Sequence, residues 1–398
     1  MRILMILNEE FPPDYRVEKE AKSLIDSGHD VKLLCYTTQN THSKVENYNG
    51  IDVRRFKINR KIRNKLHALY LILPIYRWIW THHIQRLIRE EKADVLHIHD
   101  LPLSDIGVAM KKRYGLKVVC DQHEYYSNWI GQNAHLNTLI GKIVKAFSNW
   151  KQYERKMLVK ADLVITVEEP LRLEYIKNVG VGTDRIITVP NTPEKSFMEK
   201  EIDQAIIRRY KNNFVLFYLG GIDILRGIDI AIQALPVIIK TIPEVKMVLA
   251  GKVWKNSDPI KIAKKLNVEE YVDFVGWLSV DMLPSYIAAS DVCFHIPPVM
   301  REENNKTIAT KIYQYMMIGK PIICGQAKMM RELILQNEAG LDIKDSDSED
   351  FAARVKELYR NSELREQLAI NSLKTGKRFI WGNTVTPLIK NYEKMNHK

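Results

Sequence analysis

Cysteine is scarce in this chain, and the few cysteines form no recognisable framework. The 398 residues include four cysteines, which are far apart in mostly apolar, strand-like segments: Cys35, Cys120, Cys293 and Cys324. Zinc sites and disulfide scaffolds need clustered or regularly spaced cysteines, so neither is indicated. We therefore expect four reduced thiols in the core of a cytoplasmic protein.

Long apolar runs are also missing. No segment approaches the roughly 18 consecutive apolar residues that span a bilayer. The N-terminal sequence MRILMILNEE passes from a strand-like run directly into a loop and shows no signal-peptide cleavage pattern. We expect neither a membrane-spanning helix nor a secretory leader.

Acidic residues are in deficit, because 48 of them face 60 lysines and arginines, for a net charge of +12. A basic balance favours anionic partners, namely nucleic acid, phosphorylated ligands or a membrane surface. Zinc-finger spacing, RNP-type motifs and an arginine-rich tail are all lacking, so we expect no nucleic-acid partner. Phosphorylated ligands and membranes are the remaining classes.

Strand-like and helix-like segments alternate twice along the chain. Residues 1–36 read as a strand, a proline-set loop, a helix and a second strand, which is how a parallel sheet begins. Residues 192–213 carry no strong pattern and read as a linker, after which the same rhythm restarts. We expect a first Rossmann-like domain over 1–195 and a second over 196–379, with a last helix within 380–398 that returns to the first domain.

Residues 304–323 (NNKTIATKIYQYMMIGKPII) are the most informative stretch. They predict a short amphipathic helix over 310–318, closed by Gly319 and followed by a buried strand. The N-terminus of such a helix presents free N–H groups and about half a positive charge, so it favours anions.

Residues 60–91 differ in composition from the rest. Basic residues flank tyrosines, tryptophans and aliphatic residues, and Pro74 predicts a kink. This is the composition of a helix that lies in a membrane interface, although a helix pair covering the sheet would show it too.

Ligands of open parallel sheets bind beyond the carboxyl ends of the strands. Two such sheets that face each other would form a central cleft lined by the loops after the strands. The expected wall residues are Asp14, Arg16, Asp100, His123, Glu124, Gly220, Gly221, Arg226, Gly251, Trp277 and residues 306–314.

An ordered series of motifs along the chain resembles one known family. The series begins with FPPDYRVEKEAKSLIDSGHDVKLL, ADVLHIHD, KVVCDQHE and ADLVITVEE, and continues with YLGGIDILRGIDIAIQA, VLAG, VDFVGWLSVDMLPSYIAASDVCFHIPP and KIYQYMMIGKPII. Together they resemble the GT-B-fold glycosyltransferases, in particular retaining glycosyltransferase family 4, over nearly the whole chain. The resemblance implies an α/β protein with two Rossmann-like domains facing a cleft.

The resemblance also implies a function and a site. The expected reaction is metal-independent transfer of a sugar from a UDP- or GDP-sugar to a polysaccharide or lipid-linked glycan, with no cofactor. His123 and Asp100 would face the transferred sugar and the acceptor, and Arg226 would bind the diphosphate, whose negative charge grows as the glycosidic bond breaks. The residues expected around the donor are Arg16, Gly220, Gly221, Gly251, Gly276, Trp277, Lys306, Thr310, Lys311 and Gln314.

Some positions depart from the family pattern. The family carries two glutamates eight positions apart where this chain has Lys306 and Gln314, and a basic residue where it has Gly221. Lys306 reverses a charge near the sugar. The loop after the first strand also lacks the family's usual paired glycines, and we expect Arg16 in that loop to supply phosphate charge instead.

Two patterns could suggest a metal. His97 and His99 share one face of a strand before Asp100, and Asp345-Ser346-Asp347 resembles the D-x-D of metal-dependent glycosyltransferases. No third group of ligands follows the histidines, and helix capping explains the aspartates better. We expect no metal site.

A competing hypothesis is a non-catalytic partner subunit that keeps the fold and binds a nucleotide or a protein. In the enzyme reading, the protein is cytoplasmic and peripheral on the inner face of an anionic membrane.

Overall fold

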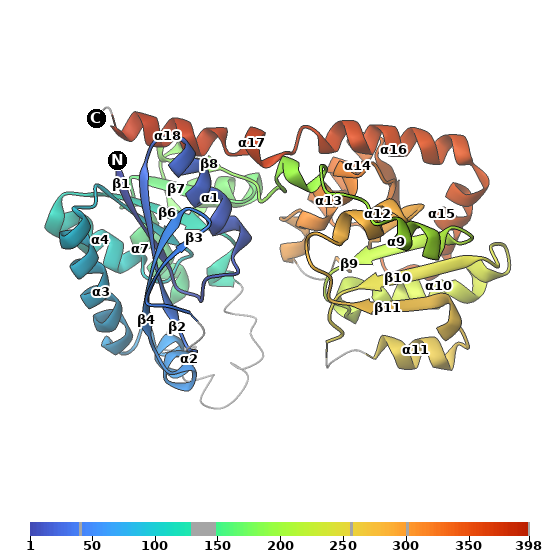
Figure 1. Cartoon of the computed structure of the whole chain (residues 1–398), viewed down its shortest axis with the longest axis horizontal. Helices are drawn as coiled ribbons and strands as arrows, with labels where there is room; N and C mark the ends of the chain where they lie inside the picture. Colours follow the sequence, from blue (N-terminus) through green and yellow to red (C-terminus); the bar gives the residue numbers. More distant parts are fainter. Residues whose placement is uncertain (40–41, 129–148, 255–257, 300–301, 397–398) are drawn as a thin grey trace. The chain divides into compact units, whose positions relative to one another are not determined.

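The computed structural model describes residues 1–39, 42–128, 149–254, 258–299 and 302–396 (Figure 1). The chain forms two compact units. Unit 1 comprises Met1–Pro190 with Val385–Lys398, and unit 2 comprises Asn191–Thr384. Each unit has its own sheet with apolar side chains buried against it.

Unit 1 is built on an eight-stranded sheet with the order β3-β4-β2-β1-β5-β6-β7-β8. All neighbouring strands run parallel except β3, which pairs antiparallel with β4. The strands are β1 (Arg2–Leu7), β2 (Asp30–Thr37), β3 (Val45–Tyr48), β4 (Ile51–Lys57), β5 (Val95–His99), β6 (Lys117–Gln122), β7 (Leu163–Thr166) and β8 (Ile186–Thr188).

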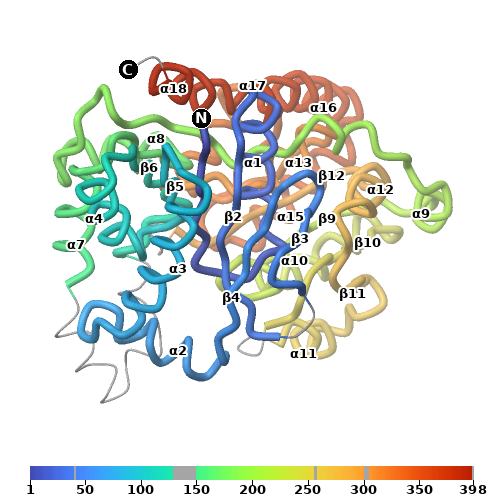
Figure 2. The backbone as a smooth tube through the Cα atoms, turned by 60° about the vertical axis from the view of Figure 1, so that its left-hand side comes forward, coloured from blue at the N-terminus to red at the C-terminus, as the bar shows by residue number. Residues whose placement is uncertain are grey.

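Helices cover the sheet of unit 1. They are α1 (Tyr15–Asp26), α2 (Arg60–Ala68), α3 (Ile75–Glu91), α4 (Ser104–Tyr114), α7 (Trp150–Leu158), α8 (Glu169–Glu174) and α18 (Thr386–Asn396), with short turns η2 (Tyr175–Val179) and η3 (Thr183–Arg185). Residues of α3, α4 and α7 pack with those of β1 and β5 in one core. Figure 2 shows α18 near the N-terminus of β1.

Unit 2 is built on a six-stranded parallel sheet with the order β11-β10-β9-β12-β13-β14. The strands are β9 (Phe214–Leu219), β10 (Val245–Ala250), β11 (Val272–Gly276), β12 (Val292–His295), β13 (Ile322–Cys324) and β14 (Gly340–Asp342). The fold class predicted from the sequence, two parallel-sheet α/β domains, is confirmed. The expected cleft concerns the placement of the two units and stays a prediction.

The helices of unit 2 form two groups. On one side, α10 (Ile228–Ile239), α11 (Pro259–Lys265), α15 (Ser348–Arg360) and the start of α16 (Ser362–Gly376) contribute to one core. On the other, α9 (Gln204–Tyr210), α12 (Leu283–Ala288), α13 (Thr310–Met317) and α14 (Lys328–Gln336) contribute to a second. The remaining elements are η4 (Lys195–Phe197), η5 (Ile224–Arg226), η6 (Glu269–Tyr271), η7 (Glu302–Asn305) and α17 (Trp381–Thr384).

Several local predictions can be compared with these elements. The helix expected over 310–318 is α13, and Gly319 follows it with φ +73°. Residues 60–91 form two helices separated by residues 69–74: α2 ends at Ala68, and Pro74, where a kink was predicted, is the N-cap residue of α3. The linker prediction for 192–213 was wrong in part: α9 forms there, because Ile206 and Tyr210 are buried in the core of unit 2.

All four cysteines are free and buried, as the sequence predicted. Burial raises the pKa of the Cys35, Cys120 and Cys293 thiols to about 12. No helix in the described ranges combines the length and the apolarity that crossing a membrane requires.

Candidate functional site

The carboxyl ends of β9, β10 and β11 form a backbone edge without side chains. Gly220 N donates to Ala250 O at 2.8 Å, and Gly251 N donates to Gly276 O at 2.7 Å. Gly251 has φ +147°, and a Cβ atom there would lie 1.8 Å from Gly220 O. Only glycine permits this approach, so the edge is open to a ligand that contacts backbone.

Lys311 is a buried cation beside this edge. It lies in the first turn of α13 and is 8% exposed. Its Nζ donates to the Tyr218 hydroxyl at 3.2 Å and lies 4.3 Å from the centre of that ring. A Cβ on Gly220 would meet Nζ at 2.6 Å, so the ammonium sits against the glycine edge.

No carboxylate pairs with Lys311 in the part of the chain that the structure describes. Burial lowers the pKa of Lys311 well below its ordinary value, and the charge of Arg226 lowers it further. Ala309, at the N-cap of α13, offers no side-chain acceptor to the first N–H groups. A buried amine beside such a helix end is poised for an anion.

Arg226 lies close enough to Lys311 for its charge to act on it, and it belongs to a capped turn. It ends η5, where Asp223 Oδ1 accepts from Leu225 N at 2.9 Å. Gly227 follows with φ +75°, and a Cβ there would lie 2.1 Å from Ile296 O. The Arg226 side chain is exposed, so its guanidinium is available to an anionic ligand.

His295 and Tyr218 belong to this cluster and were not predicted from the sequence. His295 ends β12, is 4% exposed, and its ring centre lies 6.0 Å from that of Tyr218. Its Nδ1 has no hydrogen-bond partner among the described residues. Burial lowers its pKa well below the ordinary value, and Lys311 and Arg226 lower it further. The one sequence feature that could have indicated His295 is its position at the end of a predicted strand.

The other predicted residues of unit 2 lie on neighbouring segments. Thr310 Oγ1 donates to Asn191 O at 3.3 Å, which ties the start of α13 to the beginning of the unit. Gln314 is half-buried one turn further along α13, and Lys306 is half-buried in the segment before it. A Cβ on Gly221 would lie 2.4 Å from Trp254 Nε1. Trp277 follows Gly276 and is 73% exposed.

In unit 1, the structure brings His123 and Asp100 together. Both follow the carboxyl ends of neighbouring strands, β6 and β5, and His123 Nδ1 lies 3.7 Å from Asp100 Oδ1. His123 Nε2 donates to Asp121 Oδ2 at 2.6 Å. Asp100 does not cap α4, whose N-cap position is Leu103. The two side chains are 18% and 27% exposed, so a ligand can reach both.

Arg16 does not fit the expected phosphate role. It is 4% exposed, and its guanidinium bonds Asp121 through Nε at 3.1 Å and Nη2 at 2.9 Å. Nη2 also lies 2.8 Å from Glu20 Oε1, and Nη1 donates to Val189 O at 2.9 Å. The guanidinium N–H groups therefore bond to acceptors of the protein itself. The prediction that Arg16 supplies charge to the phosphates of the nucleotide-sugar is corrected.

Four groups with the chemistry of metal ligands approach one another around Arg16. Donor atoms of Glu20, His97, His99 and Asp121 lie within 4.8 Å of one another, all buried. The Arg16 guanidinium already pairs with both carboxylates, so the cation of this cluster is an arginine. The other pattern that could suggest a metal, Asp345-Ser346-Asp347, includes a helix cap. The Asp347 side chain accepts from Glu349 N and Asp350 N at the start of α15.

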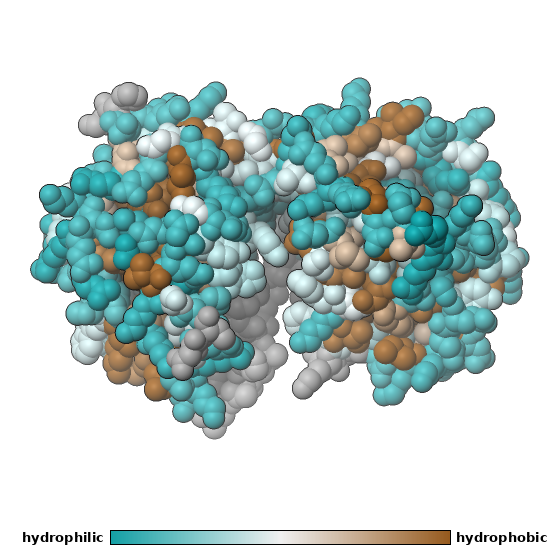
Figure 3. Space-filling view, in the orientation of Figure 1, coloured by the Kyte–Doolittle hydropathy of each residue, from teal (hydrophilic) through white to brown (hydrophobic). Residues whose placement is uncertain are grey.

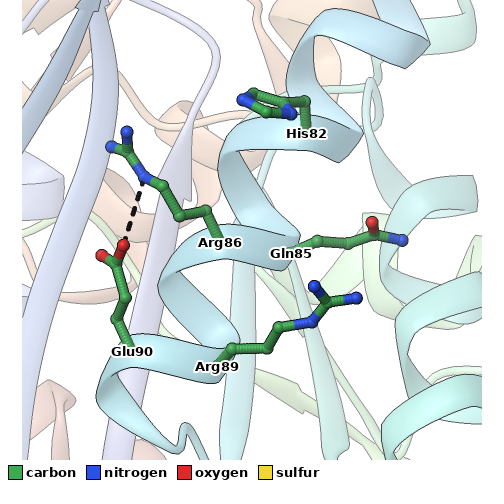
Figure 4. A pocket seen from close by; sticks show the side chains of 5 residues that line it. All are labelled: His82, Gln85, Arg86, Arg89 and Glu90. Carbon is green, nitrogen blue, oxygen red and sulfur yellow. Dashed lines mark ion pairs between the residues drawn. The ribbon is translucent and has the colours of Figure 1, made fainter.

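A shallow depression of about 290 Å³ lies on α3, and none of its lining residues was predicted for the site (Figure 4). Its lining residues are His82, Gln85, Arg86, Arg89 and Glu90. Arg86 Nε lies 3.7 Å from Glu90 Oε1, and Arg89 Nε donates to the Tyr114 hydroxyl at 3.2 Å. The depression is basic and open, unlike the glycine edge of unit 2.

Two family models match the chain almost end to end. The model "Glycosyl transferase 4-like domain" matches residues 13–192, and "Glycosyl transferases group 1" matches residues 199–375. Among curated relatives, spore coat protein SA of Bacillus subtilis is 26% identical over 334 residues, which cover 77% of this chain and 87% of that protein. D-inositol 3-phosphate glycosyltransferase of Thermomonospora curvata is 22% identical over 321 residues, covering 75% and 71%.

A solved structure with the same fold contains a nucleotide. HepE of Anabaena in complex with UDP has a TM-score of 0.71 and 16% identity, and the alignment covers 99% of this chain and 100% of that one. The same protein in complex with UDP-glucose has a TM-score of 0.70 at 16% identity, with the same coverage. At this identity the likeness shows the fold.

Proposed function

The chain belongs to the GT-B-fold glycosyltransferases of the family 4 type, and from this premise we propose a retaining, metal-independent enzyme that uses a UDP- or GDP-sugar. It transfers a hexose-type sugar to a polysaccharide or lipid-linked glycan intermediate. The solved relative with bound UDP and UDP-glucose supports a nucleotide-sugar donor.

The observation that carries the proposal is the unpaired cationic cluster of unit 2. Lys311 is buried with no carboxylate partner in the described residues, the charge of Arg226 reaches it, and both act electrostatically on His295. Burying an amine without an anion is unfavourable, so a protein keeps one mainly where a ligand supplies the negative charge. A nucleoside diphosphate group supplies that charge.

The same cluster would stabilise the departing nucleotide. As the bond between the sugar and the diphosphate breaks, negative charge grows on the diphosphate oxygens. Lys311, Arg226 and the N–H groups at the start of α13 offer fixed positive potential, and the burial of Lys311 makes its contribution larger than it would be in water. Protein cations can thus supply the charge that a divalent metal supplies in other glycosyltransferases, which supports metal independence.

A donor screen tests this proposal. Thermal shift and nucleotide release are measured with a panel of UDP- and GDP-sugars in the presence of a chelator. We expect one donor to stabilise the protein and to release its nucleotide slowly even without acceptor. A thermal shift without turnover of any donor, including in the presence of glycan acceptors, would favour a non-catalytic partner subunit with Lys306 and Gln314 at the usual glutamate positions.

Retention has its own test. The anomeric proton coupling of the transferred sugar is measured by NMR directly after transfer. An α-linked product from an α-linked donor is expected, and an inverted product would refute the retaining part.

We further propose that the acceptor is met at an anionic membrane on the cytoplasmic side, where the protein is peripheral. Between Arg60 and Arg89 the chain has seven basic residues and no acidic one. The exposed apolar side chains of this region are Ile62, Ile72, Leu73, Ile75 and Trp78. Figure 3 shows brown side chains among teal ones at the lower left, over the part of unit 1 that contains α2 and α3.

Both kinds of side chain are needed for interfacial binding. Exposed aromatic and aliphatic groups enter the headgroup region, while lysines and arginines contact anionic lipids. Trp78 is 66% exposed, and Arg86 and Arg89 line the open depression on the same helix (Figure 4).

Vesicle flotation tests the membrane part. The wild type should float with phosphatidylglycerol-containing vesicles at low salt and less so at high salt. The double variant Ile75→Ser/Trp78→Ser should bind several-fold less, while Ile370→Ser, which removes a similarly exposed apolar side chain from α16 of unit 2, should bind normally. Failure of the wild type to float with anionic vesicles at low salt would refute this part.

A further inference from the structure

Asp121 is the centre of a buried hydrogen-bond network in unit 1. Its side chain is fully buried and lies within hydrogen-bond distance of three residues, from α1, from β5 and from the segment after β6. Arg16 of α1 donates to both carboxylate oxygens, at 3.1 and 2.9 Å. His99 Nδ1 of β5 lies 3.3 Å from Oδ2, and His123 Nε2 lies 2.6 Å from the same oxygen. A carboxylate with this many donors is held ionised, and its pKa is well below the ordinary value despite burial.

His123 connects this network to the exposed side of the sheet. Its Nε2 faces inward to Asp121, and its Nδ1 lies 3.7 Å from Asp100 Oδ1. Asp121 and its neighbours below are fully buried, whereas His123 is 18% exposed and Asp100 27%. The imidazole therefore lies between two carboxylates, one that fixes it and one that a ligand can reach.

The charged and titratable groups around His123 come from three elements. β6 supplies Asp121, β5 and the residue after it supply His99 and Asp100, and α1 supplies Arg16 and Glu20. Burial alone would lower the pKa of His123, and Arg16 opposes its charge. Asp100 and Asp121 outweigh both and raise the pKa to about 10. Burial raises the pKa of Glu20 to about 7, so Glu20 carries less than a full charge near neutrality.

We propose that Asp121 is a positioning residue that holds His123 as an imidazolium, so that His123 meets the substrate as a hydrogen-bond donor and fixed cation and not as a general base. The inward nitrogen is committed to Asp121, and the Nδ1–H beside Asp100 is the one available to a sugar hydroxyl. The role of His123 toward the sugar rests on the proposed glycosyl transfer. The charge of His123 and the positioning role of Asp121 are independent of that function.

A histidine that keeps both protons at neutral pH cannot remove the proton of an acceptor hydroxyl. In this site that proton must pass to another group. Arg16 has a role as well, because it neutralises Asp121 in part and so keeps the network from holding two uncompensated buried carboxylates.

NMR titration of the full chain tests the proposal without any donor. The protein is labelled at histidine Cε1, and the His123 signal is identified by its loss in His123→Gln. We expect no titration of this signal between pH 5 and 8. Asp121→Asn and Asp100→Asn should each lower its midpoint by at least about one pH unit, because each removes one of the flanking carboxylates.

Asp100→Asn keeps the test usable if Asp121→Asn does not fold, and Asp94→Asn serves as the control. Asp121→Asn leaves Arg16 short of an anion and can fail to fold, whereas Asp100 is partly exposed and makes no contact with Arg16, so Asp100→Asn keeps the test available. Asp94→Asn is the matched control: it lies at the opposite end of β5, pairs with Arg2 at 2.8 Å, and should leave the His123 signal unchanged. A wild-type His123 that titrates between pH 6 and 7, or one unaffected by both network variants, would overturn the proposal.

A pH profile separates positioning from a merely structural role. With a donor that turns over, Asp121→Asn should keep kcat/KM below pH 6 and lose it about tenfold per pH unit above its lowered His123 midpoint. A uniform loss at every pH would instead mean that Asp121 only supports the fold, and would overturn the positioning role. If the wild type turns over a donor but its His123 titrates near neutrality, this inference is wrong and the proposed function stands. If His123 stays charged but the wild type turns over no donor, the proposed function is wrong and this inference stands.

Discussion

Replacing Lys311 by methionine should change ligand affinity and protein stability in opposite directions. In the free protein the Lys311 amine is buried, has no carboxylate partner in the described ranges, and contacts the hydroxyl and the ring of Tyr218. Methionine fills a similar volume without a charge. Tyr218 keeps a partner, because its hydroxyl also donates to Gly221 O at 3.0 Å.

The expected magnitudes follow from these contacts. A hydrogen bond to a charged group is worth about 1.5–3 kcal/mol, so loss of the ammonium should weaken UDP or GDP binding about 10- to 150-fold. Exchanging a buried amine that lacks an anionic partner for a well-packed apolar side chain should stabilise the protein by about 1–3 kcal/mol. For a unit of this size each kcal/mol corresponds to a rise in Tm of about 2–4 °C.

Isothermal titration gives the affinity, and a thermal melt of the free protein gives the stability. Lys320→Met is the matched control. Lys320 is half-buried, and its Nζ donates to Ala288 O at 2.8 Å and Ser290 O at 2.6 Å. Its loss should lower the Tm and leave nucleotide affinity unchanged. If Lys311→Met bound the nucleotide as the wild type does, or melted below it, the assignment of Lys311 to the donor would be refuted.

Three further predictions concern the same residues. Because burial and Arg226 lower the pKa of Lys311 and a diphosphate anion would raise it again, nucleotide binding should take up protons between the free and the bound pKa and weaken as the pH rises through that range; calorimetry in buffers of different ionisation enthalpy measures this, and an affinity that does not change with pH, without proton uptake, would contradict it. Arg226→Gln should weaken nucleotide binding about tenfold or more with little change in Tm, because the side chain is exposed; an unchanged affinity would remove Arg226 from the site. Arg16→Met should lower the free energy of unfolding by about 3–5 kcal/mol, since it leaves Asp121 and Glu20 buried without their cation. Its nucleotide affinity, titrated at a temperature where the variant is folded, should equal that of the wild type. A stable variant that bound the nucleotide weakly would restore Arg16 to the donor site.

Local patterns were sufficient to predict most of the architecture. The alternation of strands and helices gave two parallel-sheet units, and the apolar spacing after Thr310 with Gly319 gave α13 within one residue. Strand β3 was missed because Val45–Tyr48 is short and lies at the sheet edge, where half-exposed residues alternate weakly. Helix α9 was missed because its amphipathic face becomes apparent only through the core that it joins.

The candidate site was predictable where backbone position decides and not where long-range partners decide. Gly220, Gly251 and Lys311 follow from the rule that ligands meet strand ends and helix N-termini. Arg16 satisfied the same rule, but Asp121, 105 positions away, and Glu20 take its guanidinium. His295 carried no local signal beyond its strand end, since its importance comes from Lys311 and Arg226, which approach it only in the folded unit.

Sugar transfer from a nucleotide-sugar is the property that most directly distinguishes an enzyme from a non-catalytic partner subunit. The decisive measurement is nucleotide release, coupled to a panel of UDP- and GDP-sugars and glycan acceptors in the presence of a chelator, for the wild type, Lys311→Met and Arg226→Gln. We predict acceptor-stimulated release from one donor by the wild type and a reduction of kcat/KM of tenfold or more in both variants. Release from no donor by the wild type, or equal release by all three proteins, would contradict the account.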